Sequence, residues 1–432
     1  MRRRRRRAGR LNRWGFRMKA RHTVLSILFA TWIVSSVDRM AMSVALPYIS
    51  SDFGLGPLEG GILLSAFFLG YSLAHIPGGI LADRFGVRRV ATVALLWWSA
   101  FTALTGIATG KAVMLVARFV FGLGEGLYPA CAFKTIATWF PKRERATANA
   151  MMLASNPLGL AISPLVVVAV MSIWGWRAVF LVLFVPGIVI AALVWQLVRD
   201  RPSESPRVSS TELAEIEDGE EAASEHHGAG GIMAALREPN ILRFFLVLFT
   251  FDIAFWGFTA WLPTYLVKER GLSMGQMGVA AALPFLVGTV GSVLGGWLSD
   301  HVFTRQRRFP IIACEVASAL FLYLTFTATT LQSVIVYQTA AGFFLMTFFA
   351  VFWALPMNSI PQNVMGIASG FINMAGQLAA FIAPLLFGYL VQVTGDFGVT
   401  FGVLVFALLL SSALVLTLPN GTEPARMPGV PA

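Results

Sequence analysis

Charge and cysteine are both scarce in this sequence. Only 13% of the 432 residues are Asp, Glu, Lys or Arg, about half of the roughly 25% found in soluble domains, and the mean hydropathy is +0.71. The two cysteines, Cys131 and Cys314, lie inside apolar runs, which excludes a disulfide framework and a cysteine-rich metal site. The composition predicts a membrane protein that needs no metal or cofactor.

Acidic residues are absent from positions 1–22, which hold eleven of the 33 Lys and Arg residues. The remaining 22 basic residues balance 22 acidic ones, so this segment alone accounts for the net charge of +11. We interpret it as a cytoplasmic arm that binds anionic lipid head groups and expect no nucleic-acid partner. A start at Met18 is an alternative, in which case residues 1–17 are not native. An ATP-binding P-loop pattern is also missing, so active transport would draw on an ion gradient.

Twelve apolar windows of about 20 residues, the length that crosses a bilayer, predict an all-α membrane protein. Residues 24–37 alone resemble a signal-peptide core, but the apolar pattern resumes after Asp38-Arg39, so we predict one helix over 24–49. The windows are 24–49, 60–82, 90–109, 113–136, 146–172, 177–198, 241–262, 275–298, 310–330, 333–357, 364–392 and 397–418.

The polar stretch between the sixth and seventh windows divides the chain. With both termini in the cytoplasm, 27 of the 33 basic residues fall in cytoplasmic segments and four outside, as the positive-inside rule requires of an inner (plasma) membrane protein. The predicted parts are a basic arm (1–22), an N-terminal six-helix half (23–198), a cytoplasmic linker loop (199–240), a C-terminal six-helix half (241–418) and a cytoplasmic tail (419–432).

A short motif follows the second window of each half. Gly79-Ile80-Leu81-Ala82-Asp83 precedes Arg84, Arg88 and Arg89, and 217 residues later Gly296-Trp297-Leu298-Ser299-Asp300 precedes Arg305, Arg307 and Arg308. We expect each glycine to let its helix end pack closely and each Asp to accept bonds from the first amides of the next helix. The matched order indicates two parallel six-helix repeats with a site between them.

This motif, continued through Gly86 and Arg88, resembles the loop motif of the major facilitator superfamily. Other segments resemble its anion:cation symporter family, which includes bacterial proton-coupled importers of sugar acids and other organic carboxylates. These segments are Asp38-Arg39, Ser65-Ala66-Phe67 with Tyr71 and Ile76-Pro77-Gly78-Gly79, Arg118 with Glu125, Trp139-Phe140-Pro141 with Glu144-Arg145, Pro263-Thr264-Tyr265-Leu266 and Gly370-Phe371-Ile372-Asn373. The resemblance implies a twelve-helix transporter and not an enzyme.

Four charged residues lie deep inside predicted helices. A charge at mid-bilayer is unfavourable by roughly 2.5–3.5 kcal/mol, so each should face a wet cavity or a partner. Adjacent helical positions do not face one another, so Asp38 and Arg39 need different partners. Arg118 and Glu125, seven residues apart, share one helix face at two depths. We expect all four at one central cavity.

The chemistry of these groups suggests their roles. The Arg39 guanidinium keeps its charge and offers a fork that matches a carboxylate, so we predict that it anchors the substrate. A carboxylate in a partly dry site binds a proton more readily than one in water, which suits Asp38 and Glu125 as proton-coupling groups, with Arg118 biasing them. A static network, Asp38 with Arg118 and Arg39 with Glu125, is the structural alternative.

Five further residues are weaker candidates. Tyr71, Asn156, Asn373 and Trp353 are predicted to contact the substrate, and Asp252 to be an additional proton or substrate contact. The resemblance is incomplete at the polyol end of the site. Ser36 stands where sugar-acid transporters often have Tyr, Asn156 replaces an expected Gln, and Trp353-Ala354-Leu355-Pro356 lacks the expected hydroxyls.

The sequence thus predicts a monomeric importer of a sugar acid or similar monocarboxylate, driven by protons, with Na⁺ not excluded. A proton-coupled antiporter of drugs or other organic solutes is the alternative. It is disfavoured because residues 159–164 lack the Gly-rich Gly-Pro sequence expected there.

Overall fold

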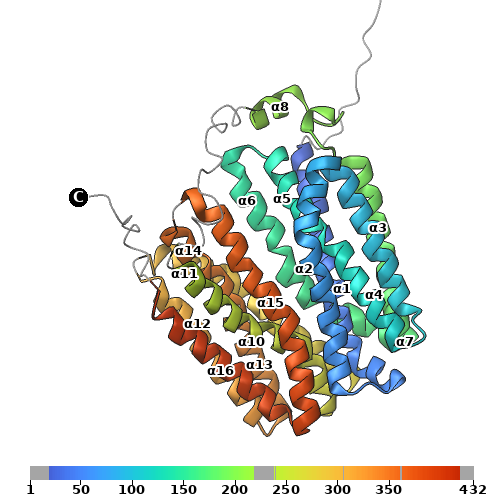
Figure 1. Ribbon diagram of the computed structural model, residues 1–432, viewed down its shortest axis with the longest axis vertical. Helices are drawn as coiled ribbons and strands as arrows, with labels where there is room; N and C mark the ends of the chain where they lie inside the picture. Colours follow the sequence, from blue (N-terminus) through green and yellow to red (C-terminus); the bar gives the residue numbers. More distant parts are fainter. Residues whose placement is uncertain (1–18, 218–237, 239, 305, 361, 419–432) are drawn as a thin grey trace, which may run out of the picture.

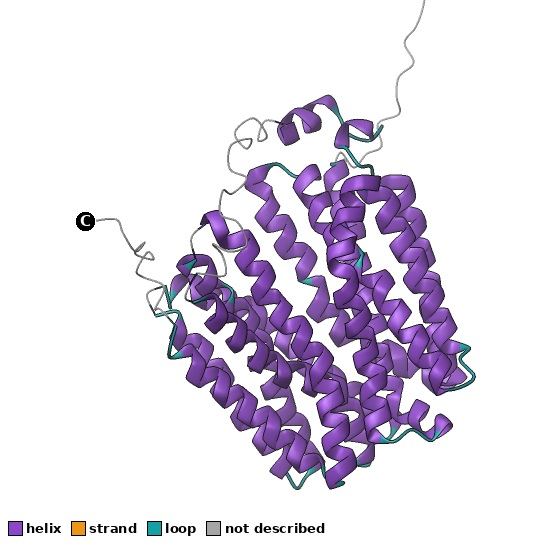
Figure 2. Cartoon of the chain, in the orientation of Figure 1, coloured by secondary structure: helices purple, strands orange, loops and turns teal. Residues whose placement is uncertain are grey.

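The computed structural model describes residues 19–217, 238, 240–304, 306–360 and 362–418 (Figure 1). Within these residues the chain is helical and contains no strand (Figure 2). The basic arm before residue 19, the tail after residue 418 and most of the linker loop, over 218–237, lie outside this part. Long helices suit an apolar chain because a helix satisfies its backbone hydrogen bonds internally, as a bilayer requires.

The first half of the molecule contains α1 to α7. Its largest element, α7, contains a non-helical residue, Gly175, with φ 78° and ψ 171°. The segment before Gly175 packs on α1, where Ser163 Oγ donates to the Val37 carbonyl at 3.1 Å, and the later segment packs on α3. The helices are α1 (Ala20–Phe53), α2 (Pro57–Phe85), α3 (Val87–Gly106), α4 (Lys111–Gly126), α5 (Tyr128–Trp139), α6 (Lys142–Leu153) and α7 (Ser155–Leu197).

The second half contains α10 to α16. Its helices are α10 (Ile241–Lys268), α11 (Met274–His301), α12 (Arg308–Thr327), α13 (Leu331–Phe352), α14 (Ala354–Ser359), α15 (Gln362–Thr394) and α16 (Phe397–Val415). Each of the twelve apolar windows lies mainly on helices. In the described residues ten helices are long and apolar enough to cross a membrane. The count is lower than twelve because residues 142–197 form one continuous stretch across Gly175, and α3 is not among the ten.

Part of the predicted linker is structured. A 3₁₀ turn, Pro202–Glu204, precedes α8 (Ser210–Glu217), and Ser209 Oγ accepts the Glu212 amide at 3.1 Å, which caps α8. The Glu212 side chain in turn accepts the Ala20 and Arg21 amides at 3.1 and 3.0 Å. These amides are free donors at the start of α1, so α8 covers the N-terminus of α1 (Figure 1).

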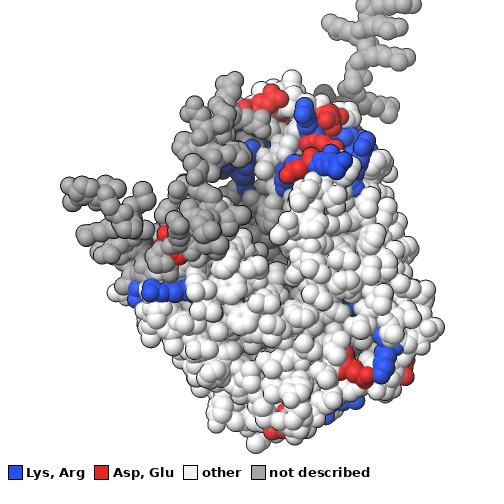
Figure 3. All heavy atoms as spheres, viewed as in Figure 1, with Lys and Arg blue, Asp and Glu red and all other residues white. Residues whose placement is uncertain are grey.

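The two halves meet most tightly at the end opposite α8. There a Cβ on Gly61 of α2 would lie 2.5 Å from the Pro384 carbonyl oxygen of α15, and one on Gly388 would lie 2.5 Å from the Pro57 carbonyl oxygen. Toward the α8 end, α2 and α15 diverge (Figure 1). On the visible face, charged side chains gather toward the two ends and a largely uncharged band separates them (Figure 3). This band has the chemistry of a membrane-spanning surface.

Candidate substrate and proton site

Arg39 and Glu125 form an ion pair in the middle of the first half. Arg39 Nε and Nη2 both lie 2.8 Å from Glu125 Oε1, and Nη2 also donates to Ser35 Oγ at 2.9 Å. Ser35 donates to the same carboxylate oxygen at 2.5 Å. Sequence analysis missed Ser35, although its position one helical turn before Arg39 is the spacing at which side chains meet. The Arg39–Glu125 contact of the static-network alternative is therefore present.

Asp38 does not complete that network. It is 2% exposed, its Oδ1 has no hydrogen-bond partner, and it forms no ion pair with the described residues. A buried acceptor without a partner is unfavourable. Asp38 is therefore a buried carboxylate whose Oδ1 has no partner in the described residues.

Arg118 is also left with free donors. It is 2% exposed, and its Nε and Nη1 reach no acceptor in the described part of the chain. Its guanidinium instead lies against two rings, with Cζ 4.3 Å from the Phe121 centroid and 5.5 Å from that of Phe67. Phe67 also lies beside Arg39, at 5.7 Å. These cation–π contacts leave the in-plane N–H donors of Arg118 available to an anion.

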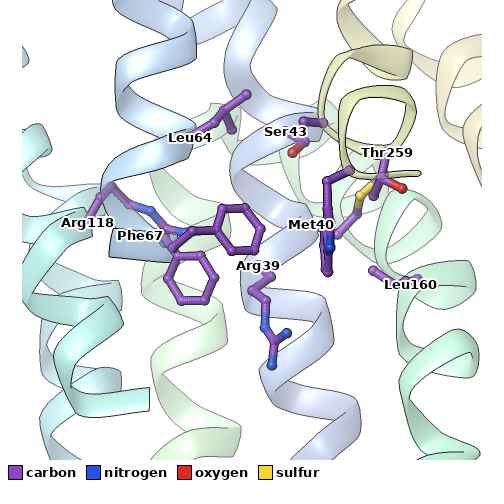
Figure 4. Close-up of a pocket in the computed structure, with 11 residues that line it drawn as sticks. Arg39, Met40, Ser43, Leu64, Phe67, Arg118, Leu160 and Thr259 are labelled. Atoms are coloured by element: carbon purple, nitrogen blue, oxygen red, sulfur yellow. The ribbon is translucent and has the colours of Figure 1, made fainter. Parts of the chain in front are cut away.

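Both arginines line one cavity between the halves. Figure 4 shows Arg118 entering beside Phe67 and Arg39 extending from α1. The cavity has a volume of about 30 Å³, which has room for water but not for an organic acid, so binding such an acid needs the surrounding groups to move. Its lining comes from α1, α2, α4, α7 and α10: Arg39, Met40, Ser43, Leu64, Phe67, Phe68, Arg118, Leu160, Trp256, Thr259 and Ala260.

The weaker substrate candidates lie at different distances from this cavity. Tyr71 is buried beneath Arg39, with the guanidinium 5.1 Å from its ring centroid. Asn156 is half-buried and accepts the Ser36 hydroxyl at 2.7 Å. Trp353 stands at the junction of α13 and α14 with its ring 5.6 Å from that of Phe352, and Asn373 is exposed on α15. Of these, Tyr71 is in contact with the charged cluster.

Asp252 lies one helical turn from Trp256 on α10. It is 4% exposed, and its Oδ1 has no partner. Oδ2 approaches α15, where a Cβ on Gly376 would lie 2.4 Å from it. The structure thus places Asp252 at the α10–α15 interface and not in the cavity lining.

Two expectations for the loop motif are wrong. A Cβ on Gly79 would make only an ordinary contact of 3.9 Å, and one on Gly296 would meet nothing within 4 Å. The preceding glycines make the close approaches instead. A Cβ on Gly78 would lie 2.8 Å from the Leu127 Cα, and one on Gly295 would lie 2.6 Å from Thr347 Cγ2. In both halves, the glycine that packs closely is therefore one residue earlier in the helix than the glycine we predicted.

Asp83 does not cap α3 either. Its carboxylate pairs with Lys134 of α5 at 2.6 Å, and Asp200, which follows α7, accepts the Arg88 amide at 2.9 Å. Asp200 takes this place because Gly86 has φ 85° and no side chain, and a Cβ there would lie 2.6 Å from the Asp200 carboxylate. Of the other motif residues, Arg84 lies over the Phe85 ring at 5.2 Å. Asp300 is in α11, but its side chain is outside the described part.

The ten membrane-spanning helices of the described residues, with two buried arginines at a cavity between the halves, define a multi-pass membrane protein. The sequence profile of the Major Facilitator Superfamily matches residues 27–384. The chain belongs to this superfamily.

Similar proteins agree with this assignment. The hexuronate transporter of Bacillus subtilis is 29% identical over 93% of this chain and 96% of its own. A probable sulfoacetate transporter of Cupriavidus necator is 33% identical over 89% and 90%, and a probable galactarate/D-glucarate transporter of Escherichia coli K12 is 33% identical over 86% and 88%. These relatives are transporters, and the chain is a transporter rather than an enzyme.

A solved structure shows the same fold. The bacterial homologue of the human lysosomal transporter Spinster, in an inward-facing, unoccupied conformation, superposes with a TM-score of 0.73. The match covers 92% of this chain and 95% of that one at 18% identity, so it supports the fold alone.

Proposed function

We propose that this protein imports an organic anion, a sugar acid or similar monocarboxylate, together with protons across the inner membrane. The observation that carries the proposal is the pairing of Arg39 with Glu125 beside Arg118, whose buried donors are free. Relatives named for hexuronate, galactarate and sulfoacetate support an organic-anion substrate.

Anion binding follows from the donors on the two arginines. An incoming carboxylate meets the free Nε and Nη1 of Arg118 and competes with Glu125 for Arg39. A guanidinium fork binds a carboxylate at two points, so one anion satisfies groups that the empty site leaves unpaired. Tyr71, packed on Arg39, holds that side chain in place.

Proton coupling follows from the same competition. When the substrate takes Arg39, Glu125 loses its counter-charge while it remains buried, and it must bind a proton or stay an uncompensated charge. Asp38, already without an ion-pair partner in the described residues, is a second proton carrier. Two protons with one monovalent anion would move one net positive charge inward.

Alternating access would expose this site to each side of the membrane in turn. The tight glycine contacts between α2 and α15 are at the end opposite α8, and the halves diverge toward the α8 end (Figure 1). Rocking of one half against the other around the arginine site would break the contacts at one end and form new ones at the other.

Uptake into proteoliposomes tests the proposal. A panel of labelled carboxylates is offered under an imposed pH gradient, an imposed Na⁺ gradient, or neither, with and without an inside-negative potential. We expect at least one carboxylate to accumulate when the outside is acidic, and more so with the potential. Accumulation driven by the Na⁺ gradient alone would identify Na⁺ instead of H⁺ as the coupling ion. Exchange of organic cations for protons would support the antiporter alternative.

A further inference from the structure

The lining of the cavity between the two halves differs sharply between its charged end and the rest. Beyond Arg39 and Arg118, its polar side chains are the hydroxyls of Ser43 and Thr259, and the other residues are apolar: Leu64, Phe67, Phe68, Leu160, Trp256 and Ala260, with Met40 beside Arg39. A substrate anchored at the arginines therefore places its body against carbon.

Aromatic rings lie next to the two arginines. The Phe67 ring contacts both guanidinium groups, at 5.7 and 5.5 Å. The neighbouring Phe68 meets Trp256 of the opposite half, with ring centroids 4.9 Å apart and planes inclined by 65°. Edge-to-face and offset contacts of this kind are the arrangement in which rings attract other rings.

The groups at the cavity that could bind substrate hydroxyls are few, and of these the Thr259 hydroxyl has no partner. Ser36 and Asn156 are hydrogen-bonded to each other at 2.7 Å. Trp353, which stands where hydroxyl-bearing residues are expected, packs on Phe352. A polyol enclosed by this lining would leave most of its hydroxyls without partners, which weakens binding because each has lost its water.

We infer that the substrate of this transporter is a monocarboxylate with a flat apolar body, an aryl carboxylate, rather than a polyhydroxylated sugar acid. The inference rests on the proposed function, since it presumes that the arginines bind the carboxylate. The two arginines recognise the head group, and Phe67, Phe68 and Trp256 recognise the ring. An apolar pocket changes the relative affinity of two ligands by roughly 10–200-fold for each group that it fits or excludes. We expect a difference of that size between aryl acids and sugar acids.

The test compares binding of phenylacetate, benzoate, cyclohexanecarboxylate, glucuronate and gluconate to the purified full-length protein by calorimetry, alongside uptake of labelled phenylacetate and glucuronate. We expect the aryl acids to bind at least about 10-fold more tightly than either sugar acid, and cyclohexanecarboxylate to fall between them. Equal or tighter binding of glucuronate would overturn the aryl assignment and leave the proposed function intact. Failure of both classes to bind, with no uptake under any gradient, would overturn the proposed function itself.

Variants locate the effect in the ring cluster. Trp256→Gln should lower phenylacetate affinity about 10-fold or more, while Trp256→Phe, which keeps a ring, should stay within a few-fold of the parent. Trp174→Gln is the matched control, because Trp174 is 65% exposed and is not part of the cavity lining. Leu160→Asn, which adds an amide to the lining, should narrow the ratio of phenylacetate to glucuronate affinity. An unchanged ratio in both Trp256→Gln and Leu160→Asn would contradict the inference even if the protein prefers aryl acids.

Discussion

Arg39 of α1 and Glu125 of α4 share a hydrogen-bonded ion pair in which two guanidinium nitrogens lie 2.8 Å from one carboxylate oxygen. This contact joins the predicted substrate anchor to a predicted proton carrier. The second arginine on the same cavity, Arg118, has no such partner in the described residues. The site thus holds one guanidinium that is paired with a carboxylate and one that is not.

The first prediction concerns the geometry of the anchor. Arg39→Lys keeps the charge but loses the fork that reaches Glu125, Ser35 and the substrate at once. We expect substrate affinity to fall at least about 10-fold, a loss of ~1.4 kcal/mol. Calorimetric titration of the purified variant measures it. Arg177→Lys, at a half-exposed arginine paired with Asp52, is the control, and near-normal affinity in Arg39→Lys would reduce Arg39 to a structural charge.

The second prediction concerns coupling. Asp38→Asn and Glu125→Gln should abolish gradient-driven accumulation while substrate still binds, because an amide keeps hydrogen bonds but carries no proton. In the parent protein an inside-negative potential of 100 mV, worth about 2.3 kcal/mol for one charge, should raise accumulation roughly 50-fold. Flux with and without valinomycin measures this. Glu59→Gln, on the exposed Lys111 pair, should behave as the parent. Concentrative uptake by Glu125→Gln, with unchanged charge movement per substrate, would exclude Glu125 as a coupling group and support the static-network interpretation.

The third prediction concerns topology. A cysteine introduced by Ser210→Cys, at the start of α8, should react with a membrane-impermeant maleimide only when the cytoplasmic side is accessible. Both native cysteines are buried, so their background labelling should be low. Thr330→Cys, between α12 and α13, should give the opposite pattern. Labelling of position 210 from outside intact cells would contradict the cytoplasmic placement of the linker.

The fourth prediction concerns helix packing beside the site. A Cβ on Gly122 would lie 2.2 Å from the Phe67 carbonyl oxygen and 2.9 Å from the Tyr71 amide nitrogen. Backbone cannot move aside as a side chain can, so Gly122→Ala should lower the free energy of unfolding by about 1–3 kcal/mol and weaken substrate binding. Thermal unfolding in detergent checks the first effect. Gly402→Ala, where nothing lies within 4 Å, should be neutral or stabilising.

The fifth prediction concerns the contact of α8 with α1. Hydrogen bonding from Lys19 Nζ, at 2.6 Å, and the nearby Arg21 hold the pKa of Glu215 below its ordinary value of 4.5. A lowered pKa means that the contribution of Glu215 to this contact is fully present above that value and is lost as the pH falls through the folded-state pKa. A spin label at Ala214→Cys should stay immobile from neutral pH down to about 5 and loosen in stronger acid. Glu215→Gln should remove this transition. An identical transition in that variant would show that a group other than Glu215 causes it.

The sequence by itself determined the helices and the identity of the buried charges. Apolar windows of membrane-spanning length form helices whatever their neighbours are, because the bilayer leaves the backbone no other partner. For the same reason Arg39, Glu125, Asp38 and Arg118 could be found as charges that need an explanation. The superfamily itself is shown by the profile match over residues 27–384.

Only the tertiary structure decided which groups meet. The pairing of Arg39 with Glu125, the open donors of Arg118, and the capping of α3 by Asp200 instead of Asp83 depend on how each helix is rotated and how closely backbones approach. Asp252 shows the same limit, since its place at the α10–α15 interface follows from contact with Gly376. Helical periodicity places a residue on a face, but the packing of neighbouring helices decides what that face touches.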